Sequence, residues 1–479
     1  MSIPSTGPVS FSQLRSALGG SGTVSYSSYA PLAGLSKNNV ALSQFHGQVK
    51  AQSAGLMYRT FSGYFGSTTG GADDTTWFDR QTETNSGLVS NFTSLNSSSA
   101  GLYTAQSGAT LFSIEWFGYF FAPTTGTYTF TTNSDDASYL WIGSSALVGY
   151  TPSNATVSNG EPHPVQAISG TVSLTAGTYY PIRVQYGQNM SGYDFYMSFS
   201  GPSITTISDF TGYVFFGLGS NSSFPANAAR LIRSVTGTNT DGMYYINVNG
   251  TSTQTYCLMN SAWNGGGWMM ALKMARGTTF PFSSTYWTDS STTLNSSDMT
   301  RNTADAKYNI MNYGMMKDIL AVWTDTGYKG GSIASPPETS WTWEVDNYYS
   351  SGTRTTILTG LSSANSRTVA NDASGNGPSE SSSSFTFSGW NANIWSTEGG
   401  IAAHVMGGGS HLPSNSGAYA RWGFIFNNET NWQSIDVFGG IGMGFNGTWT
   451  YNVSAGDYIG CCANTSGLNR TMAVHLFGR

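Results

Sequence analysis

The sequence has few charged residues and no long apolar run, and each shortage excludes a class of protein. Charged residues make up 9% of the 479 residues, whereas an ordinary soluble domain has about 25%. The formal net charge is −6 and no basic run occurs, so the clustered cations of a nucleic-acid surface are missing. No apolar stretch approaches the ~20 residues that span a bilayer. We therefore expect neither nucleic-acid binding nor a membrane span.

Cysteine is also scarce. Three cysteines, Cys257, Cys461 and Cys462, are too few for a disulfide framework. The last two are adjacent, so a bond between them would need a strained geometry. Free buried thiols are the favoured interpretation, and a bond from Cys257 to one of the others stays open.

The first residues, MSIPSTGPVS, have neither a positive region nor an apolar region of the kind that opens a secretory signal. We expect a protein that is made in the host cytoplasm without a signal peptide. An extracellular type of composition then fits assembly into a virus particle, although an unusual secretion route would give the same pattern.

Uncharged polar residues and aromatic rings take the place of the missing charges. Serine, threonine, asparagine and glycine are abundant, and aromatic residues reach 14%. Neutral amides and hydroxyls pair with sugar hydroxyls, and aromatic rings pack on the C–H faces of sugars. The composition therefore suits carbohydrate binding, but a stable extracellular β protein that avoids charge would look the same.

The length predicts two to four domains at roughly 100–200 residues each. Residues 1–54 form an N-terminal docking or oligomerisation segment, in which Ser10 caps a short helix with Phe11, Leu14 and Leu18 on its apolar face. Glycines 19 and 20 end this helix. The segment has too few apolar residues for a core of its own, so we expect it to dock onto a partner or onto copies of itself.

The rest of the chain is predicted to be mainly β, with a C-terminal α+β domain. Residues 55–203 show short alternating strands, for example 117–122 and 128–132 around a turn at 124–126, which is typical of a β-sandwich. A linker is expected at 204–225. The third region, 226–479, is rich in glycine and tryptophan, and its best helix candidate is 304–320.

The strongest local pattern is the pair Asp135-Asp136 at the end of a predicted strand. Adjacent carboxylates repel each other unless a positive group lies between them. Calcium fills that role well, because it takes about six to eight oxygen ligands. An Asx-type turn between two strands is the alternative interpretation, and the spacing alone leaves both open.

Longer motifs add a resemblance over residues 55–203. The run WFGYFFAPTTGTYTF at 116–130, the aspartate pair, and YPIRVQY at 180–186 resemble the protective-antigen-like β-sandwich of yeast flocculins and GLEYA adhesins. This resemblance implies that Asp135 and Asp136 hold a calcium ion through a cis peptide bond, and that the ion coordinates sugar hydroxyls. It also implies that Asn189 and Tyr193, in the loop after the matching strand, bind the sugar.

The C-terminal region has a second resemblance. Asp241-Gly-Met-Tyr, a strand ending at Cys257, and Gly-Gly-Gly-Trp268 resemble the opening of a fibrinogen-like domain. Later pieces, Phe426-Asn-Asn-Glu429 and the last residues 473–479, are similar to intelectin-type lectins. Those lectins hold a sugar diol on calcium between aromatic walls, but the histidine expected after the glutamate is replaced here by Thr430.

The implied C-terminal site combines oxygen ligands with aromatic walls. The implied calcium ligands are Asn427 and Glu429, with Asp436 or Asp457 as substitutes, and the implied walls are Trp432 and Trp449. The alternatives are a hydrogen-bonded turn at 427–429 and core packing for the two tryptophans.

The N-terminal run GPVSFSQLRSALGGSG, followed by LSQFHG, resembles structural proteins of marine phages and large viruses. We therefore predict a non-enzymatic surface fibre or spike of a virus particle, which binds cell-surface glycans or polysaccharide through calcium. Capsid or tail proteins are the expected partners of the N-terminal segment. A homo-oligomer, a trimer for a fibre, is expected to raise the avidity of weak sites.

Two other function classes stay open. A structural virion decoration protein without sugar binding would share every fold-level feature. A glycan depolymerase would need two carboxylates about 5–9.5 Å apart. Isolated acids exist, but their spacing selects no pair; they are Glu115, Glu338, Glu344, Asp346 and Glu398.

Overall fold

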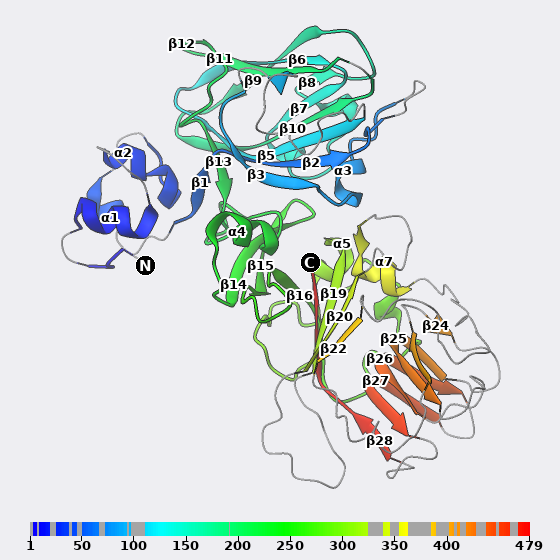
Figure 1. The fold of residues 1–479 in the computed structure, drawn as a ribbon. Coiled ribbons are helices and arrows are strands. Elements are labelled where there is room, and N and C mark those ends of the chain that lie inside the picture. Colours follow the sequence, from blue (N-terminus) through cyan, green and yellow to red (C-terminus); the bar gives the residue numbers. More distant parts are fainter. Residues whose placement is uncertain are drawn as a thin grey trace. The chain divides into compact units, whose positions relative to one another are not determined.

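The computed structural model describes residues 3–6, 9–19, 25–37, 41–45, 50–66, 72–92, 95–96, 111–190, 192–323, 339–344, 354–362, 385–388, 402–406, 410–411, 418–427, 437–446, 450–459 and 468–479. The chain forms two compact units, of which unit 1 is Met1–Thr238 with Tyr244–Gln254, and unit 2 is Asn239–Met243 with Thr255–Arg479 (Figure 1). Among the described residues, none of the helices has the length and apolar character that crossing a membrane requires.

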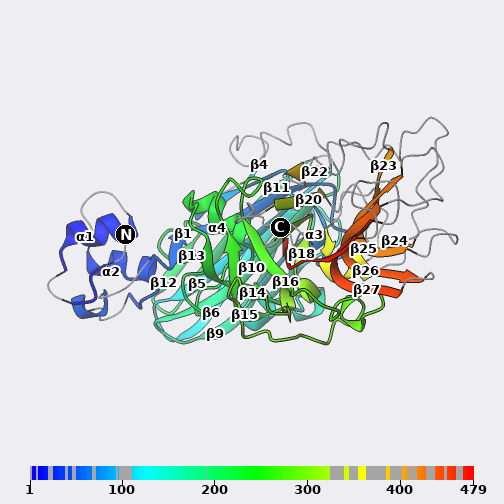
Figure 2. The same cartoon turned by 90° about the horizontal axis from the view of Figure 1, so that it is seen from below.

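The predicted N-terminal helix is confirmed. Helix α1 (Phe11–Leu18) begins after Ser10, whose hydroxyl accepts from the Gln13 backbone N–H (3.3 Å) while the Gln13 side chain accepts from the Ser10 N–H (2.7 Å). This reciprocal pair is a capping box. Gly19 ends the helix with a φ of 79°, a left-handed value that glycine adopts readily. Helix α2 (Tyr26–Tyr29) lies beside α1 in both views (Figure 1, Figure 2).

The N-terminal segment has a small core of its own, which differs from the expectation. Leu14, Leu18, Tyr29 and Phe45 are at most 1% exposed. Aliphatic residues are scarce in this segment, so aromatic rings fill much of its core. The ring centroids of Phe11 and Tyr26 are 4.4 Å apart in a stacked arrangement. Aromatic side chains bury a large area each, so few of them suffice.

The same segment docks onto the β-sandwich of its own chain, within unit 1. The Lys37 ammonium donates to the Gly212 carbonyl oxygen (2.6 Å), and the Tyr179 hydroxyl donates to the Leu35 carbonyl oxygen (2.9 Å). Docking onto a virion protein or onto other copies stays a prediction.

Unit 1 contains the predicted β-sandwich, and every pairing that follows is antiparallel. One sheet has the order β1-β13-β5-β10-β7-β8, with β2 between β5 and β3; the other has the order β12-β11-β6-β9, with β4 on β11. Their bounds are β1 Gln52–Ala54, β2 Leu56–Ser62, β3 Asn85–Val89, β4 Leu95–Asn96, β5 Phe112–Ala122, β6 Gly126–Asp135, β7 Ser138–Ile142, β8 Val157–Asn159, β9 Gln166–Leu174, β10 Thr178–Gln188, β11 Asp194–Gly201, β12 Ile204–Ile207 and β13 Val214–Gly217.

Rings from both sheets fill the sandwich core. Trp116 stacks on Phe195 with ring centroids 4.8 Å apart, and Phe120 meets Phe130 edge to face at 5.1 Å. All four side chains are fully buried. The short helices of unit 1 are α3 (Trp77–Arg80) and α4 (Ala229–Thr236), with 3-10 turns at Pro31–Ala33, Leu42–Phe45, Ser144–Ala146 and Pro152–Asn154.

Residues 204–225, expected as a linker, belong to the sandwich. They include β12, which pairs with β11, and β13, which pairs with β1 and β5. Phe210 is fully buried, with its ring 4.7 Å from that of Phe199. The unit boundary falls instead between 238 and 255. The polar run at 219–223 led to the expectation of a linker, although the residues before it are apolar and pair in the sheet.

The rest of the chain forms two further sheets, which belong to unit 2 except for Tyr244–Gln254 in β14 and β15, a segment that groups with unit 1. The first has the order β14-β15-β16-β29-β19-β20-β22 with β17 on β16, the second has the order β23-β25-β26-β27-β28 with β24 on β25, and β18 pairs with β21. Their bounds are β14 Gly242–Val248, β15 Thr251–Leu258, β16 Trp268–Met274, β17 Ala306–Lys307, β18 Met315–Met316, β19 Asp318–Trp323, β20 Thr339–Glu344, β21 Thr355–Thr356, β22 Phe385–Ser388, β23 Ala402–Met406, β24 Ser410–His411, β25 Ala418–Asn427, β26 Val437–Asn446, β27 Thr450–Ile459, β28 Leu468–Thr471 and β29 Val474–Gly478.

The predicted helix at 304–320 was wrong. Only α5 (Asn309–Tyr313) is helical there, and the end of that range enters strand β19. Strand β19 pairs with β29 and β20. Its successive side chains point to opposite faces of the sheet, and Ile319, Leu320 and Val322 are all at most 1% exposed, so both faces are covered. A short apolar run of this kind does not distinguish a buried strand from a buried helix. The other helical pieces of unit 2 are α7 (Ile357–Ser362) and a 3-10 turn at Thr285–Trp287.

Cys257 is fully buried on β15 and makes no disulfide with any described residue. Burial raises the pKa of its thiol well above the usual range, so the thiol is unreactive. Cys461 and Cys462 lie outside the described residues.

Candidate functional site

The aspartate pair lies in the turn between β6 and β7 of unit 1. The peptide bond between Asp135 and Asp136 is cis, as the resemblance to the flocculins implied. The turn is positioned by β10, which pairs with β7. At the end of β10, the Gly187 N–H donates to the Ala137 carbonyl oxygen (2.9 Å). The strand ends of two distant segments therefore meet here.

Two hydrogen bonds tie the loop after β10 to this turn. The Asn189 backbone N–H donates to Oδ2 of Asp136 (2.7 Å), across 53 residues of sequence. The Tyr186 hydroxyl donates to the Asp135 carbonyl oxygen (2.6 Å). Asp135, Asp136 and Asn189, all predicted from the sequence, are thus brought together.

Negative charge accumulates at this turn. Asp136 is 8% exposed, Asp135 is half-buried, and Asp194 of β11 lies opposite Asp135 in the sheet. Burial, and then the charges of Asp136 and Asp194, raise the pKa of Asp135, and only His163 opposes them. Within the described residues, no lysine or arginine forms an ion pair with Asp135 or Asp136. A bound cation would relieve this repulsion.

A buried amide oxygen completes the oxygen set. Asn189 is 6% exposed, and its Oδ1 has no hydrogen-bond partner among the described residues. An unsatisfied buried acceptor costs about 1–3 kcal/mol, and a cation would satisfy it. Two carboxylates and an amide oxygen are hard ligands of the kind that calcium prefers. The described part of the chain has no cluster of three or more His, Cys, Asp or Glu that could hold a metal; here the third ligand would be an amide.

Tyr193 is located differently from the other predicted residues. Its half-buried ring meets Phe112 edge to face at 5.4 Å and packs against the sandwich core. Met190, which sequence reasoning did not single out, is 65% exposed and directly follows Asn189. In the sequence, Met190 could have been noticed as an apolar residue within a polar loop that follows a predicted strand.

A further acid that sequence reasoning missed supports the turn. Asp73 is 6% exposed and accepts from the hydroxyls of Tyr64 (3.1 Å) and Tyr139 (2.8 Å) and from the Glu161 N–H (2.7 Å). Tyr139 lies on β7, three residues after Asp136. These bonds anchor the strand that follows the aspartate pair, and no sequence pattern marks Asp73.

The predicted C-terminal site falls largely outside the described residues. Asn427 ends β25, and Asp457 lies on β27 opposite Gly439 of β26, but only their backbones are described. Glu429, Trp432, Asp436 and Trp449 lie outside the described residues. The intelectin-like site therefore stays a prediction.

The acids considered for a depolymerase do not form a pair among the described side chains. Glu115 is fully buried and held by Arg59 (2.5 Å), Arg183 and Gln185 (3.1 Å). Glu344 lies on β20, where only the backbone is described, and Glu338, Asp346 and Glu398 lie outside the described residues. Glu115 has no access to a substrate.

Comparisons with known proteins match the sandwich. The GLEYA domain model matches residues 112–201. Flocculation protein FLO9 of Saccharomyces cerevisiae is 35% identical over 128 residues, which are 24% of this chain and 10% of that protein. The chain thus spans about a tenth of the length of this relative. Topoisomerase I damage affected protein 8 of the same yeast is 32% identical over 111 residues, which are 20% of this chain and 88% of that protein.

Solved structures give a similar match at lower identity. The epithelial adhesin 6 A domain from Candida glabrata, in complex with Galβ1-3GlcNAc, is 20% identical with a TM-score of 0.27; the match covers 38% of this chain and 91% of that domain. A PA14 sugar-binding domain from an RTX adhesin is 12% identical with a TM-score of 0.24; the match covers 34% of this chain and 98% of that domain.

Proposed function

Because this chain contains a GLEYA domain at residues 112–201, we propose that its first unit binds carbohydrate through a calcium ion and that the protein acts as an adhesin. One observation carries the proposal. The backbone N–H of Asn189 donates to the Asp136 carboxylate in the Asp135-Asp136 turn, and the buried Oδ1 of Asn189 has no donor among the described residues. The similarity to flocculation proteins supports the same function.

The chain's own residues would prepare this turn for the metal. Asp135 and Asp136 supply negative charge, and Asn189 supplies a neutral oxygen. The Asn189 N–H fixes the Asp136 carboxylate and the Tyr186 hydroxyl fixes the Asp135 backbone, so little ordering remains to be done when the ion binds. Calcium, when bound, would offer its remaining coordination positions to sugar hydroxyls. Met190, exposed beside Asn189, would meet the apolar side of the sugar.

We further propose a surface fibre or spike of a virus particle as the setting. The N-terminal resemblance to phage and large-virus structural proteins supports this, with capsid or tail proteins as partners and a trimer as the assembly. A second calcium-dependent, intelectin-like site in unit 2, with Asn427, Glu429 and the other implied residues, belongs to the same proposal.

A glycan array in calcium tests the function. The protein should be retained on particular glycans in calcium, and EDTA should release it, whereas magnesium should not replace calcium. Failure to bind any glycan in calcium would favour a structural virion protein. Release of new reducing ends from a retained polysaccharide would instead show a depolymerase.

Replacing Asn189 with alanine is expected to weaken calcium binding. The substitution removes one oxygen ligand but leaves the backbone N–H that holds Asp136, so the fold of the loop is kept. We expect a loss of at least ~10-fold in calcium affinity, the scale on which residues around a metal act. Isothermal titration with calcium measures it. Met190→Ala is the control, because it changes the neighbouring exposed side chain and should keep the affinity for calcium; equal affinities in the two variants would contradict the role of Asn189.

A further inference from the structure

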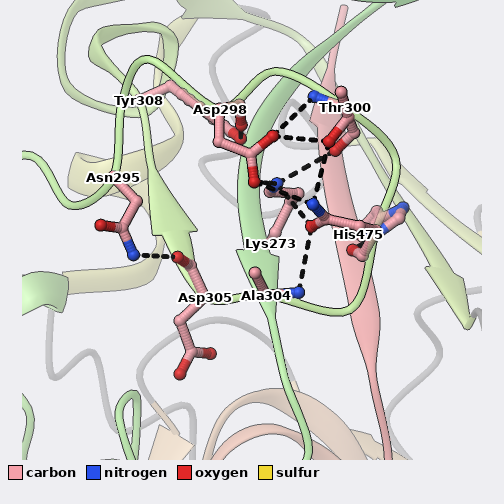
Figure 3. Close-up of polar contacts among 9 residues, drawn as sticks. Lys273, Asn295, Asp298, Thr300, Ala304, Asp305, Tyr308 and His475 are labelled. Atoms are coloured by element: carbon pink, nitrogen blue, oxygen red, sulfur yellow. Dashed lines mark hydrogen bonds and ion pairs between the residues drawn. The ribbon is translucent and has the colours of Figure 1, made fainter.

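A buried lysine lies beneath a surface loop of unit 2 (Figure 3). Lys273, on strand β16, is 0% exposed. It stands opposite His475 of β29 and Ala306 of β17, so its backbone is fixed in the middle of the sheet. A lysine is almost never fully buried unless it is paired, and its partners therefore explain why it is there.

The ammonium has three oxygen partners, all from one short loop. Its Nζ donates to Oδ2 of Asp298 (3.0 Å), to the Thr300 carbonyl oxygen (3.0 Å) and to Oδ1 of Asn302 (2.8 Å). An ammonium has three N–H groups, so this set satisfies all of them. The oxygens are one carboxylate, one backbone carbonyl and one amide.

The spacing of these residues is that of a cation-binding loop. Ligands at alternate positions, an acidic residue first and then polar residues or carbonyls, are how a calcium loop surrounds its ion. Asp298, Thr300 and Asn302 follow this alternation within DMTRN at 298–302. Here the oxygens converge on an ammonium.

Bonds within the loop hold the oxygens in this arrangement. The Thr300 hydroxyl (2.5 Å) and N–H (3.1 Å) donate to Oδ1 of Asp298, and the Asn302 amide donates to Oδ2 (2.9 Å). The bonds from Thr300, Asn302 and Lys273 lower the pKa of Asp298 well below its usual range, so the carboxylate stays ionised. Nearby, Asp305 is occupied by the Ala275 N–H and the Thr279 hydroxyl.

We propose that Lys273 is a built-in cation, which takes the place that a divalent metal ion would occupy in this loop. The loop from Asp298 to Asn302 therefore keeps its conformation without a metal ion. This holds independently of calcium binding by unit 1. The Asp298 side chain is 35% exposed and Asn302 is exposed, so an ion from solvent can reach the loop once the ammonium is removed. Removal of the lysine charge should turn the loop into a calcium site.

The test uses Lys273→Met in the full chain, with Asp135→Asn, Asp136→Asn and Glu429→Gln present throughout to disable both calcium sites proposed above. The probe is calcium alone. In EDTA, the Lys273→Met protein should melt at a lower temperature than its parent. Near 100 times the dissociation constant, calcium should raise its melting temperature by about 5–10 °C and leave the parent unchanged. Lys307→Met is the matched control, because Lys307 is also 0% exposed but, among the described residues, its Nζ donates to a single backbone carbonyl, that of Asp289 (2.6 Å).

The outcomes separate a cation loop from an ordinary buried lysine. The proposal is overturned if Lys273→Met responds to calcium no more than Lys307→Met, or if it stays unfolded in both EDTA and calcium. It is also overturned if the parent itself binds terbium at the loop, shown by luminescence that Asp298→Asn abolishes. Adding Asp298→Asn to Lys273→Met should remove the calcium response and raise the melting temperature in EDTA, because the unpaired carboxylate is gone.

Discussion

A protein carrying both Asp135→Asn and Asp136→Asn is expected to lose calcium-dependent retention on glycans. Asparagine keeps the shape of each side chain and still offers an oxygen, so the change removes mainly the two charges. Calcium affinity depends steeply on the number of charged ligands, and we expect a loss of at least ~100-fold. Calcium titration and retention on the best glycan of the array measure the two effects separately.

A single exposed aspartate elsewhere in unit 1 gives the control for the first prediction. Asp209→Asn removes a charge from the surface and should change neither calcium binding nor retention. Calcium affinity like that of the wild type in the double variant would show that the aspartate pair is an ordinary turn. Loss of calcium without loss of glycan retention would show that the sugar is held by other groups.

Glu115→Ala is expected to destabilise unit 1 by about 3–5 kcal/mol, the cost of breaking a buried ion pair from one side. Glu115 is fully buried, and its two oxygens accept from Arg59 and Arg183. Both arginines are less than 10% exposed, so the substitution leaves two buried cations without their carboxylate. Denaturant unfolding, followed by a probe in unit 1, measures the loss.

The stability that Glu115 contributes has a defined pH dependence. Burial alone would raise the pKa of Glu115, but the charges of Arg183 and Arg59 outweigh burial and lower it. The folded state therefore binds the proton less tightly than the unfolded state. The contribution is fully present above the ordinary glutamate pKa of about 4.3, and it is lost as the pH falls through the lowered value.

An exposed ion pair in the same unit provides the comparison for Glu115. Asp74 pairs with Arg80, and their side chains are 48% and 40% exposed. Asp74→Ala should cost no more than about 1 kcal/mol, because water screens such pairs. A Glu115→Ala protein as stable as Asp74→Ala would mean that Arg59 and Arg183 are solvated or neutralised by other groups.

Local patterns in the sequence predicted the elements whose causes are local. The Ser10 cap and the glycine after Leu18 defined helix α1, because both act within one turn of backbone. Alternating residues likewise marked strands such as 117–122 and 128–132. The same reasoning failed at 304–320, because the strand β19 forms by pairing with β29 and β20, both of which come later in the chain.

The candidate site was predicted only in part. The aspartate pair was visible as two adjacent letters, and the family resemblance supplied Asn189. Only the structure showed that the buried Oδ1 of Asn189 lacks a donor among the described residues, and that the ring of Tyr193 packs against Phe112. Asp73 had no sequence signal, because its three partners come from separate segments of the chain.

The sequence by itself determined a charge-poor, β-rich chain with a carboxylate pair at a strand end. Composition and periodicity reflect conformational preferences that depend on each residue and its near neighbours in the chain, and the folded structure keeps those preferences. The tertiary structure alone decided what the charged groups do: Glu115, which the sequence left open as a catalytic acid, is enclosed by two arginines, and Lys273 is enclosed by a loop. Whether a charged side chain is buried and paired depends on segments far apart in the chain. The free energy of burying its charge depends on which protein groups replace the water around it.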